Sequence, residues 1–349
     1  MLQISQYIIE QNKTIKEAIS KINNLPRHSA LILFVTNEKQ QVIGSITDGD
    51  IRRGLISGNS LDCTVDKVMQ KDFKYIKDLN DYKKANEFKK ASVYKIIPYV
   101  TEDFHLIDLI DFTRLKSVLP VDAVIMAGGQ GVRLKPYTQD TPKPLLELDE
   151  KPILGHNIDR LLDFGIKNIY ISVNHMKEQI ISYVEKNYND CNIKFIEENK
   201  PLGTVGSVRL AEEWQHDDIL LLNADILTNI DFFDFFFNYK ELNNDMSVAT
   251  FNVRINVPYG ILETEGEKVT SLIEKPSFTY NSNAGIYLFK REMVKYIPQD
   301  IKYDSTELME KLIEEKKYVS YFPIRGYWLD IGNVQNYAKA QDDIRYIKF

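Results

Sequence analysis

Residues 126–138 read MAGGQGVRLKPYT, and the tripeptide PKP follows at Pro142–Pro144. This stretch comes directly after the apolar run Ala123–Met126, which has the length and composition of a buried strand. The loop holds three glycines in four positions, Gly128, Gly129 and Gly131. Glycines let the backbone turn sharply and approach a ligand closely, and successive backbone N–H groups in such a loop can bind phosphate oxygens. We therefore expect a strand that ends in a phosphate-binding loop.

Two cations accompany this loop, and both suit phosphate. Arg133 can donate two parallel hydrogen bonds to phosphate oxygens, and Lys143 adds a mobile point charge. The two commoner phosphate motifs are excluded. A P-loop needs Gly-Lys followed by Ser or Thr, and no Gly-Lys dipeptide occurs in the chain. A dinucleotide fingerprint needs Gly or Ala three residues after Gly131, where this chain has Leu134.

Apolar runs of strand length continue along the rest of the chain, and helical segments separate the early ones. The predicted strands are Ala123–Met126, Asn168–Val173, Ile193–Ile196, Asp218–Leu222, Ser247–Val253 and Ala284–Phe289, and the predicted helices include Ile153–Phe164 and Lys177–Asn187. Strands that alternate with helices indicate an α/β fold with a doubly wound, Rossmann-like sheet, mixed but mostly parallel. We expect this domain to span residues 120–349, after a linker at Lys116–Pro120.

The glycine-rich stretch resembles the signature of sugar-1-phosphate nucleotidyltransferases, A-G-G-x-G-T-R-L-x-P-L-T followed by P-K-P. The likeness runs from Val121 to the end of the sequence. The chain departs from the signature at Val132, where Thr is usual, and at Tyr137, where Leu is usual. Val132 removes one hydroxyl near the phosphates but none of the family's charged groups. The resemblance implies nucleotide binding by the backbone of Ala127, Gly128, Gly129 and Gly131.

Further segments resemble motifs of the same family, in the same order. Gly203 and Thr204, in PLGTVG, resemble its loop beside the base and ribose. Asp225 and Asp330, in NADIL and WLDIG, resemble its two Mg²⁺-binding aspartates. The family's residues that contact the sugar phosphate have counterparts in Gly260, Glu274, Lys275 and Asn283, which lie in similar segments. Taken alone, each aspartate is more typical of a turn, and Glu274-Lys275 is more typical of a solvated pair. Their order after the glycine signature favours a site instead.

The resemblance implies a reaction in which a sugar 1-phosphate oxygen attacks the α-phosphorus of a nucleoside triphosphate and pyrophosphate leaves. Such catalysis is mostly positioning and charge stabilisation. Asp225 and Asp330 would hold Mg²⁺, Arg133 would bind the departing pyrophosphate, and Lys143 would neutralise charge at the α-phosphate. Lys275 would hold the sugar phosphate, while Glu274, Asn283 and Gly260 would fix sugar hydroxyls. No general base is required, because the attacking phosphate is already ionised.

Glu198 is the candidate for reading the base. It follows the predicted strand Ile193–Ile196, and in related transferases the residue about five positions before Gly203 contacts the base edge. An ionised carboxylate only accepts hydrogen bonds. Guanine offers it two adjacent donors, whereas the other bases place an acceptor beside their donor. GTP is therefore expected, with CTP next and UTP or dTTP behind; the alternative is that Glu198 faces solvent and backbone groups read the base.

The sugar and the pathway stay open. A nucleotidyltransferase domain preceded by a module such as residues 1–116 resembles the glucosamine-1-phosphate guanylyltransferases of legionaminic acid synthesis. This resemblance favours GDP-glucosamine as the product and a role in surface polysaccharide or nonulosonic acid synthesis. Mannose 1-phosphate or heptose 1-phosphate are alternatives. A hypothesis from another functional class is that the chain is a catalytically silent, nucleotide-sensing regulatory protein. The presence of all the metal-binding acids and phosphate-binding cations disfavours this hypothesis.

Residues 1–116 contain two copies of a small α/β pattern. The first comprises a helix at Thr14–Leu25, strands at Ala30–Thr36 and Gln41–Ile46, and a helix at Asp50–Ile56. The weaker second copy comprises a helix at Tyr82–Lys90, a strand at Tyr94–Val100, and a strand or helix at Phe104–Phe112. Internal repetition of this kind predicts a separate domain built from two related units.

This half resembles a pair of cystathionine-β-synthase (CBS) motifs, on the residues VIGSITDGDIRR at 42–53. The resemblance implies an adenine nucleotide site in which Asp50 holds the ribose hydroxyls and Thr47 lies near phosphate. The second copy lacks the glycine and the spacing, so one site at most is expected. The competing interpretation is that Thr47 or Asp48 caps the following helix and that the module is a scaffold for homo-oligomers.

Composition excludes other classes. The chain has 349 residues, a net charge of -6 and two cysteines far apart, Cys63 and Cys191, which fits two domains in a reducing cytoplasm. There is no basic stripe for nucleic acid. No apolar run approaches the ~18 residues of a membrane span, and the N-terminus lacks a signal-peptide pattern.

Overall fold

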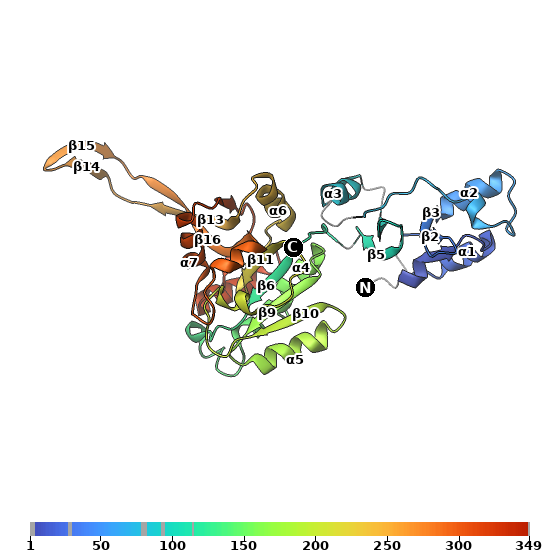
Figure 1. Cartoon of the computed structure of the whole chain (residues 1–349). Helices are drawn as coiled ribbons and strands as arrows, with labels where there is room; N and C mark the ends of the chain where they lie inside the picture. Colours follow the sequence, from blue (N-terminus) through green and yellow to red (C-terminus); the bar gives the residue numbers. More distant parts are fainter. Residues whose placement is uncertain (1–3, 27–29, 78–81, 92–94, 114, 348–349) are drawn as a thin grey trace. The chain divides into compact units, whose positions relative to one another are not determined.

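The computed structural model describes residues 4–26, 30–77, 82–91, 95–113 and 115–347 (Figure 1). The chain divides into two compact units. One comprises Met1–Pro120 with Asp163–Gly165, and the other comprises Val121–Leu162 with Ile166–Phe349. Among the helices of the described part, none combines the length and the apolar character that a bilayer crossing requires.

The larger unit is built on a seven-stranded sheet in the order β10-β9-β6-β11-β16-β13-β17. The strands are β6 (Asp122–Met126), β9 (Asn168–Val173), β10 (Asn192–Glu197), β11 (Asp218–Asn223), β13 (Met246–Asn256), β16 (Ser277–Lys290) and β17 (Val319–Pro323). Only β16 runs antiparallel to its neighbours β11 and β13; the other adjacent pairs are parallel. The predicted α/β fold with a mixed, mostly parallel sheet is confirmed for this unit.

The predicted strands at the centre of the sheet form because their side chains are buried on both faces, whereas in the edge strand β10 only Ile196 is buried. Every residue of β9 is buried, and in β6 the side chains of Val124 and Ile125 are fully enclosed. Near-continuous apolar runs are typical of such strands. The connecting helices are α4 (Ile153–Asp163), α5 (Lys177–Asn187), α6 (Phe232–Glu241), α7 (Ser305–Glu314) and α8 (Val334–Asp343). The two helices predicted from the sequence, α4 and α5, are confirmed.

Part of this unit extends beyond the sheet as a two-stranded ribbon. Strands β13 and β16 continue past it, and β14 (Ile261–Glu265) and β15 (Lys268–Ile273) complete the projection (Figure 1). We call residues 254–280 the arm. None of its residues is buried. The strand predicted at Ser247–Val253 therefore belongs to a longer element.

The smaller unit has a sheet in the order β1-β2-β3, with β1 (Ile8–Glu10), β2 (Ile32–Thr36) and β3 (Val42–Thr47). Helix α1 (Ile15–Asn23) precedes β2, and α2 (Asp48–Ile56) follows β3. The second half repeats part of this order with a bridge at Ile76, α3 (Tyr82–Lys90), and the hairpin of β4 (Ile96–Val100) and β5 (Leu106–Asp111). Phe104–Phe112 is thus mainly strand, and Tyr94 lies outside the described residues.

Candidate active site

A pocket of about 410 Å³ opens where the chain leaves the carboxyl ends of β6 and β11. Strand β6 lies between β9 and β11, so the chain winds outward in both directions from this point. Ligands of open α/β sheets bind at such a reversal of strand order. The lining includes the glycine loop (Ala127, Gly128, Gly129 and Gly131) and the segments around Lys143, Gly203 and Asp225. The structure thus brings most of the predicted nucleotide-binding residues together.

The glycine loop is shaped by one left-handed residue. Gly131 has φ +62°, and a Cβ added there would lie 3.0 Å from side-chain atoms of Lys143 and Thr138. The Thr138 hydroxyl donates a hydrogen bond of 2.8 Å to the Gly131 carbonyl, which closes the turn. Leu134 is fully buried in the core, so the short 3-10 helix at Val132–Leu134 presents Arg133 to the pocket.

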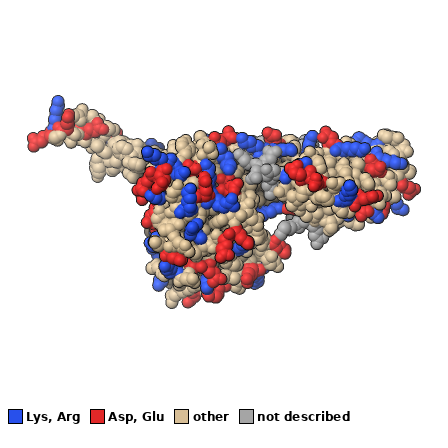
Figure 2. Space-filling view, in the orientation of Figure 1, with Lys and Arg blue, Asp and Glu red and all other residues tan. Residues whose placement is uncertain are grey.

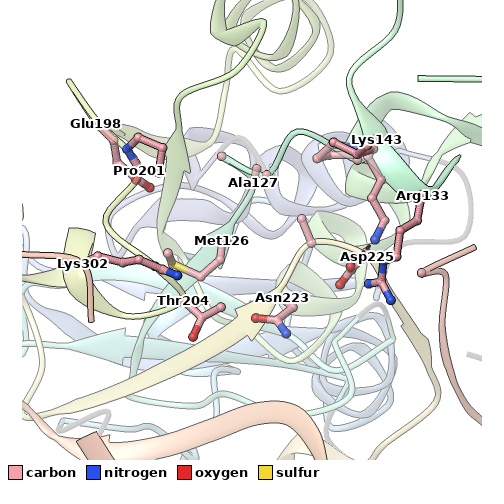
Figure 3. Close-up of a pocket in the computed structure, with 18 residues that line it drawn as sticks. Met126, Ala127, Arg133, Lys143, Glu198, Pro201, Thr204, Asn223, Asp225 and Lys302 are labelled. Atoms are coloured by element: carbon pink, nitrogen blue, oxygen red, sulfur yellow. Dashed lines mark hydrogen bonds and ion pairs between the residues drawn. The ribbon is translucent and has the colours of Figure 1, made fainter. Parts of the chain in front are cut away.

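Charged groups gather at one end of the pocket. Lys143 forms an ion pair with Asp225, and its side chain is only 11% exposed. Figure 3 shows Lys143, Arg133 and Asp225 together at this end, with Glu198 and Pro201 at the other. An enclosed lysine and an arginine beside carboxylates can hold polyphosphate together with a cation.

Asp225 and Asp330 are held together by a small antiparallel pair. Strand β12 (Ile226–Thr228) pairs with β18 (Trp328–Asp330), which places Asp330 opposite Ile226. The Ile331 N–H also donates a 3.0 Å hydrogen bond to the Asp225 carbonyl. Burial, and then the nearby Asp225 carboxylate, raise the pKa of Asp330; Lys143 and Arg133 act in the opposite direction. Two acids separated by about a hundred residues in the sequence thus interact directly.

These two carboxylates fit a divalent cation. The Asp330 Oδ1 atom is buried and has no hydrogen-bond partner in the described part of the chain, so it is oriented for a ligand that the protein itself does not supply. Within the same residues, no cluster of three or more His, Cys, Asp or Glu side chains is arranged around a metal site. Mg²⁺ usually takes one or two carboxylates and completes its shell with water and substrate phosphates. The pair is therefore sufficient for a metal shared with the substrate.

The opposite end of the pocket is formed by Glu198 and the Gly203 loop. Glu198 is 8% exposed, and its two oxygens accept hydrogen bonds from the Ser172 hydroxyl and the Leu202 N–H. It is therefore not a solvent-facing residue, as the alternative interpretation required. Gly203 has φ +81° and packs against the backbone of Tyr303.

Two polar residues that line the pocket, Lys302 and Asn223, were not among the predicted site residues. Lys302 reaches it because the Tyr303 N–H donates to the Leu202 carbonyl, which joins two loops about a hundred residues apart. Asn223 ends β11, and its buried Oδ1 atom has no partner among the described residues. No sequence motif marks Lys302. Asn223 lies two residues before Asp225, within the same NADIL segment, so it could have been recognised from that motif.

The predicted sugar-phosphate residues do not join the pocket. Gly260, Glu274 and Lys275 lie on the exposed arm, and among the described residues that line the pocket none comes from the arm. Asn283 lies at the base of the arm, where its side chain donates to the Tyr287 hydroxyl and accepts from the Gly285 N–H. In this structure the residues predicted to bind the sugar phosphate therefore do not line the predicted nucleotide pocket.

The nucleotidyl transferase family model matches residues 122–346, which include the central sheet, the glycine loop and both aspartates. The chain belongs to the nucleotidyl transferase family. It is 32% identical over 227 residues to the mannose-1-phosphate guanyltransferase of Yarrowia lipolytica, which covers 62% of this chain and 62% of that protein. It is 34% identical over 236 residues to the bifunctional protein GlmU of Methanococcus vannielii, covering 64% of this chain and 54% of that protein.

This nucleotidyl transferase spans less than two thirds of the length of those two curated relatives. Among solved structures, HddC from Yersinia pseudotuberculosis, complexed with GMP-PN, has a TM-score of 0.52 and 29% identity. That match covers 64% of this chain and 99% of HddC. All these matches leave about a third of the chain uncovered, and the family model begins at residue 122, after the smaller unit.

The smaller unit has a pocket of its own, of about 600 Å³, lined by Thr47, Asp50 and Arg53 among others. Here the polar groups satisfy one another. Thr47 caps α2 in a capping box with Asp50, and Asp50 also accepts hydrogen bonds from Arg53 and Gln70. The helix-cap interpretation of Thr47 is therefore confirmed. Burial acts to raise the pKa of Asp50, but the hydrogen bonds from Thr47 and Gln70 outweigh it and lower that pKa.

Proposed function

We propose that the chain joins a nucleoside triphosphate to a sugar 1-phosphate and releases pyrophosphate. The observation that carries this proposal is the cluster at the carboxyl end of β11, where Asp225 and Asp330 lie beside Lys143 and Arg133. Family membership supplies the reaction class, and the curated relatives are by name guanyltransferases or GlmU. The presence of both cations and Asp225 in the pocket, with Asp330 close to them, disfavours a catalytically silent sensor.

In this proposal the triphosphate lies along the pocket with its phosphates toward Arg133 and Lys143. The backbone N–H groups of the glycine loop bind phosphate oxygens, and Arg133 holds the pyrophosphate as it leaves. Lys143 exchanges its contact with Asp225 for the α-phosphate when the substrate binds. Asp225 and Asp330 would hold Mg²⁺, which when bound neutralises charge on the reacting phosphates. The attacking sugar phosphate is already ionised, so no residue has to remove a proton.

We propose guanine as the base. Glu198 is at the pocket end away from the phosphates (Figure 3), and each of its oxygens keeps acceptor capacity beside the bonds from Ser172 and Leu202. The N1–H and N2–H₂ groups of guanine match that capacity. The HddC structure holds GMP-PN, and the Yarrowia relative is named a guanyltransferase. CTP, then UTP or dTTP, are the next candidates.

For the sugar we propose glucosamine 1-phosphate, giving GDP-glucosamine for surface polysaccharide or nonulosonic acid synthesis. Mannose 1-phosphate, which the name of the Yarrowia relative contains, and heptose 1-phosphate are the alternatives. Lys275 would hold the sugar phosphate, and Gly260, Glu274 and Asn283 would fix the sugar hydroxyls. Three of these four residues lie on the arm.

For residues 1–116 we propose a CBS-domain pair that regulates or dimerises the enzyme. Support comes from the repeated order of elements in this unit and from the pocket that contains Thr47 and Asp50. An adenine nucleotide is the proposed ligand. Because Asp50 is engaged with Thr47, Arg53 and Gln70, a ribose would have to share it with groups that already bind it.

The test of the proposed activity is a pyrophosphate-release assay with GTP, CTP, UTP, dTTP and ATP against several sugar 1-phosphates in the presence of Mg²⁺. We expect turnover with GTP and one amino sugar or hexose 1-phosphate. Saturable GTP binding without turnover for every sugar phosphate would favour the sensor instead. Near-equal use of CTP or UTP would overturn the proposed base.

A further inference from the structure

The arm carries chemistry that the pocket of its own chain lacks. In the proposed reaction Lys275 holds the phosphate of the sugar substrate and Glu274 fixes its hydroxyls, yet both residues are exposed on the arm. The cations that line the pocket are Arg133, Lys143 and Lys302 among the described residues, and Lys143 is paired with Asp225. Two phosphorylated substrates must meet there, so the site of one copy is short of groups for the second substrate.

The arm is built as a stiff ribbon. From Thr250↔Asn283 to Asn256↔Ser277 its two strands pair without a break, and the register shift lies at the base, between Val248 and Thr250. Arg254 bonds across to Ser277, and the Val257 N–H donates to the Pro276 carbonyl. At the base, Phe251 stacks on Trp328 with ring centroids 3.7 Å apart.

This stiffness places Lys275 far from its own pocket. Strand β16 begins at Ser277, six residues from Asn283 and so roughly 20 Å along an extended strand, and Lys275 lies two residues beyond that strand end. To fold back onto its own pocket, the arm would have to break the ladder between β13 and β16 and the stacking of Phe251. Each broken backbone pair would leave unsatisfied groups or require new partners.

The arm also exposes more apolar surface than an isolated projection of a monomer normally does. Figure 2 shows charged side chains at its tip and a largely uncharged surface along its length. The exposed large apolar residues of the arm are Ile255, Tyr259, Leu262, Val269, Leu272, Ile273, Phe278 and Tyr280. Two-stranded ribbons are marginally stable alone, and exposed apolar patches of this kind mark contact surfaces.

The topology shows what the arm can reach. Strand β13 runs parallel to β11 and β6, because β16 is antiparallel to both β11 and β13. Its extension therefore leaves the sheet at the edge where the pocket opens. Two copies related by a two-fold axis, with their pocket edges facing, would each direct an arm toward the other's pocket. A two-fold contact of this kind is closed and self-complementary.

We propose that the arm of one copy of this chain docks at the pocket of a second copy and supplies Glu274 and Lys275 to the sugar 1-phosphate bound there. The proposal rests on the proposed function, whose sugar-phosphate residues it assigns to the other subunit. It makes the dimer the smallest active form. The apolar residues of the arm are then covered by the partner, and the missing cation reaches the site.

Subunit complementation tests this directly. A Lys275→Ala chain and an Asp225→Asn chain, each nearly inactive alone, are coexpressed with different affinity tags, and the hetero pair is isolated. If arms act on the partner, one of its two sites has an intact pocket and an intact arm, and turnover returns to about half that of wild type. The matched control pairs Lys275→Ala with the Asp225→Asn/Lys275→Ala double variant, which has no intact site in either arrangement.

An isolated hetero pair that stays as inactive as the control would overturn the proposal, as would a wild-type chain that is monomeric while turning over. A second readout does not depend on activity. A photo-crosslinking amino acid replaces Tyr259 in a mixture of ¹⁴N- and ¹⁵N-labelled full-length chains. Crosslinks between differently labelled chains, from the arm to residues 127–143 or 198–204, support exchange even if no substrate pair is turned over. Crosslinks confined to one chain would contradict it.

Discussion

The acidic side chains at the two edges of the central sheet differ in how fully the protein satisfies their hydrogen bonds. At the amino edge, Asp122 begins β6 and accepts hydrogen bonds from Asn168, His216 and the Gln215 N–H. At the carboxyl edge, beyond the other end of the same strand, Asp330 has a buried oxygen without a partner in the described chain and lies near a second carboxylate.

The pKa directions follow the same division. Burial acts to raise the pKa of Asp122, but the hydrogen bonds from His216 and Asn168 outweigh it and lower that pKa. For Asp330, burial and Asp225 both raise the pKa. An acid that the protein satisfies by itself contributes to stability. An acid that the protein leaves without hydrogen-bond partners can bind a ligand instead, and acids with perturbed pKa values cluster at functional sites.

The largest expected effect is at the carboxyl edge. Asp225→Asn and Asp330→Asn should each reduce turnover by at least ~10²-fold, because each removes one charge-stabilising contact at the reacting phosphates. Steady-state pyrophosphate release measures the loss. Near-normal turnover in either folded variant would remove that residue from the site.

The Asp330→Asn variant should not lose stability, which separates this edge from the other. The raised pKa of Asp330 means that its charged form is disfavoured in the folded chain. In metal-free buffer, neutralising it should leave Tm unchanged or higher, whereas Mg²⁺ should raise the Tm of wild type more than that of Asp330→Asn. A clear fall in Tm without metal would mean that Asp330 is structural.

At the amino edge we expect a substitution to reduce stability and to leave turnover unchanged. Asp122→Asn should lower the free energy of unfolding by about 2 kcal/mol, since a buried acceptor of charge-assisted hydrogen bonds is replaced by an amide. Turnover per folded molecule should stay near wild type. Urea unfolding measures the change. The control is Asp217→Asn, an exposed partner of Arg291, which should shift stability by less than about 0.5 kcal/mol.

The stability that Asp122 contributes should depend on pH. The folded-state pKa of Asp122 lies below the unfolded value, so its contribution is complete above about pH 4 and is lost as the pH falls through the folded-state pKa. The difference between wild type and Asp122→Asn should therefore be largest near neutrality and shrink in acid. A difference that stays constant down to pH 3 would contradict the assignment.

The central strands and the glycine loop could be predicted from the sequence. The buried strands appear as apolar runs because both faces of a parallel sheet are covered, and the glycine loop appears because Gly131 needs a positive φ. Asp225 follows directly from the strand that ends before it. These features are local, since each depends on residues within a few positions.

The features that the sequence did not yield depend on contacts between distant segments. Asp330 was assigned beside Asp225 only through the family resemblance, because their contact depends on the pairing of β12 with β18. Lys302 was missed, because its position depends on the contact between Tyr303 and Leu202. The resemblance assigned Glu274 and Lys275 to the sugar-phosphate substrate, but it gave no position for this motif in the fold. Nothing in its composition shows that β13 and β16 carry it outward on the arm.

A smaller effect is expected at the base end of the pocket. GTP should be preferred by at least ~10-fold in kcat/KM, and Glu198→Gln should erode that preference, because an amide turns one acceptor into a donor that opposes the guanine edge. The neighbouring Glu197→Gln is the control, since Glu197 is exposed and pairs with Lys177. Competition assays with paired triphosphates measure the ratio, and an unchanged ratio in Glu198→Gln would leave the base to backbone groups.

The smallest effect concerns the smaller unit, whose acid Asp50 resembles Asp122 rather than Asp330. Asp50 is 4% exposed and completes the capping box of α2, so Asp50→Ala should destabilise the unit by about 1–2 kcal/mol, the usual worth of a helix cap. The control is Asp48→Ala, on the same helix turn, whose side chain is 43% exposed and paired with Arg52.

Thermal unfolding of both variants, with calorimetric titration of AMP and ATP into the full chain, distinguishes a helix cap from a nucleotide-binding residue. If Asp50 also holds a nucleotide, wild type binds and Asp50→Ala does not, while Asp48→Ala still does. Destabilisation without nucleotide binding by wild type would make Asp50 a helix cap alone, and the unit would then contribute to the enzyme as a scaffold.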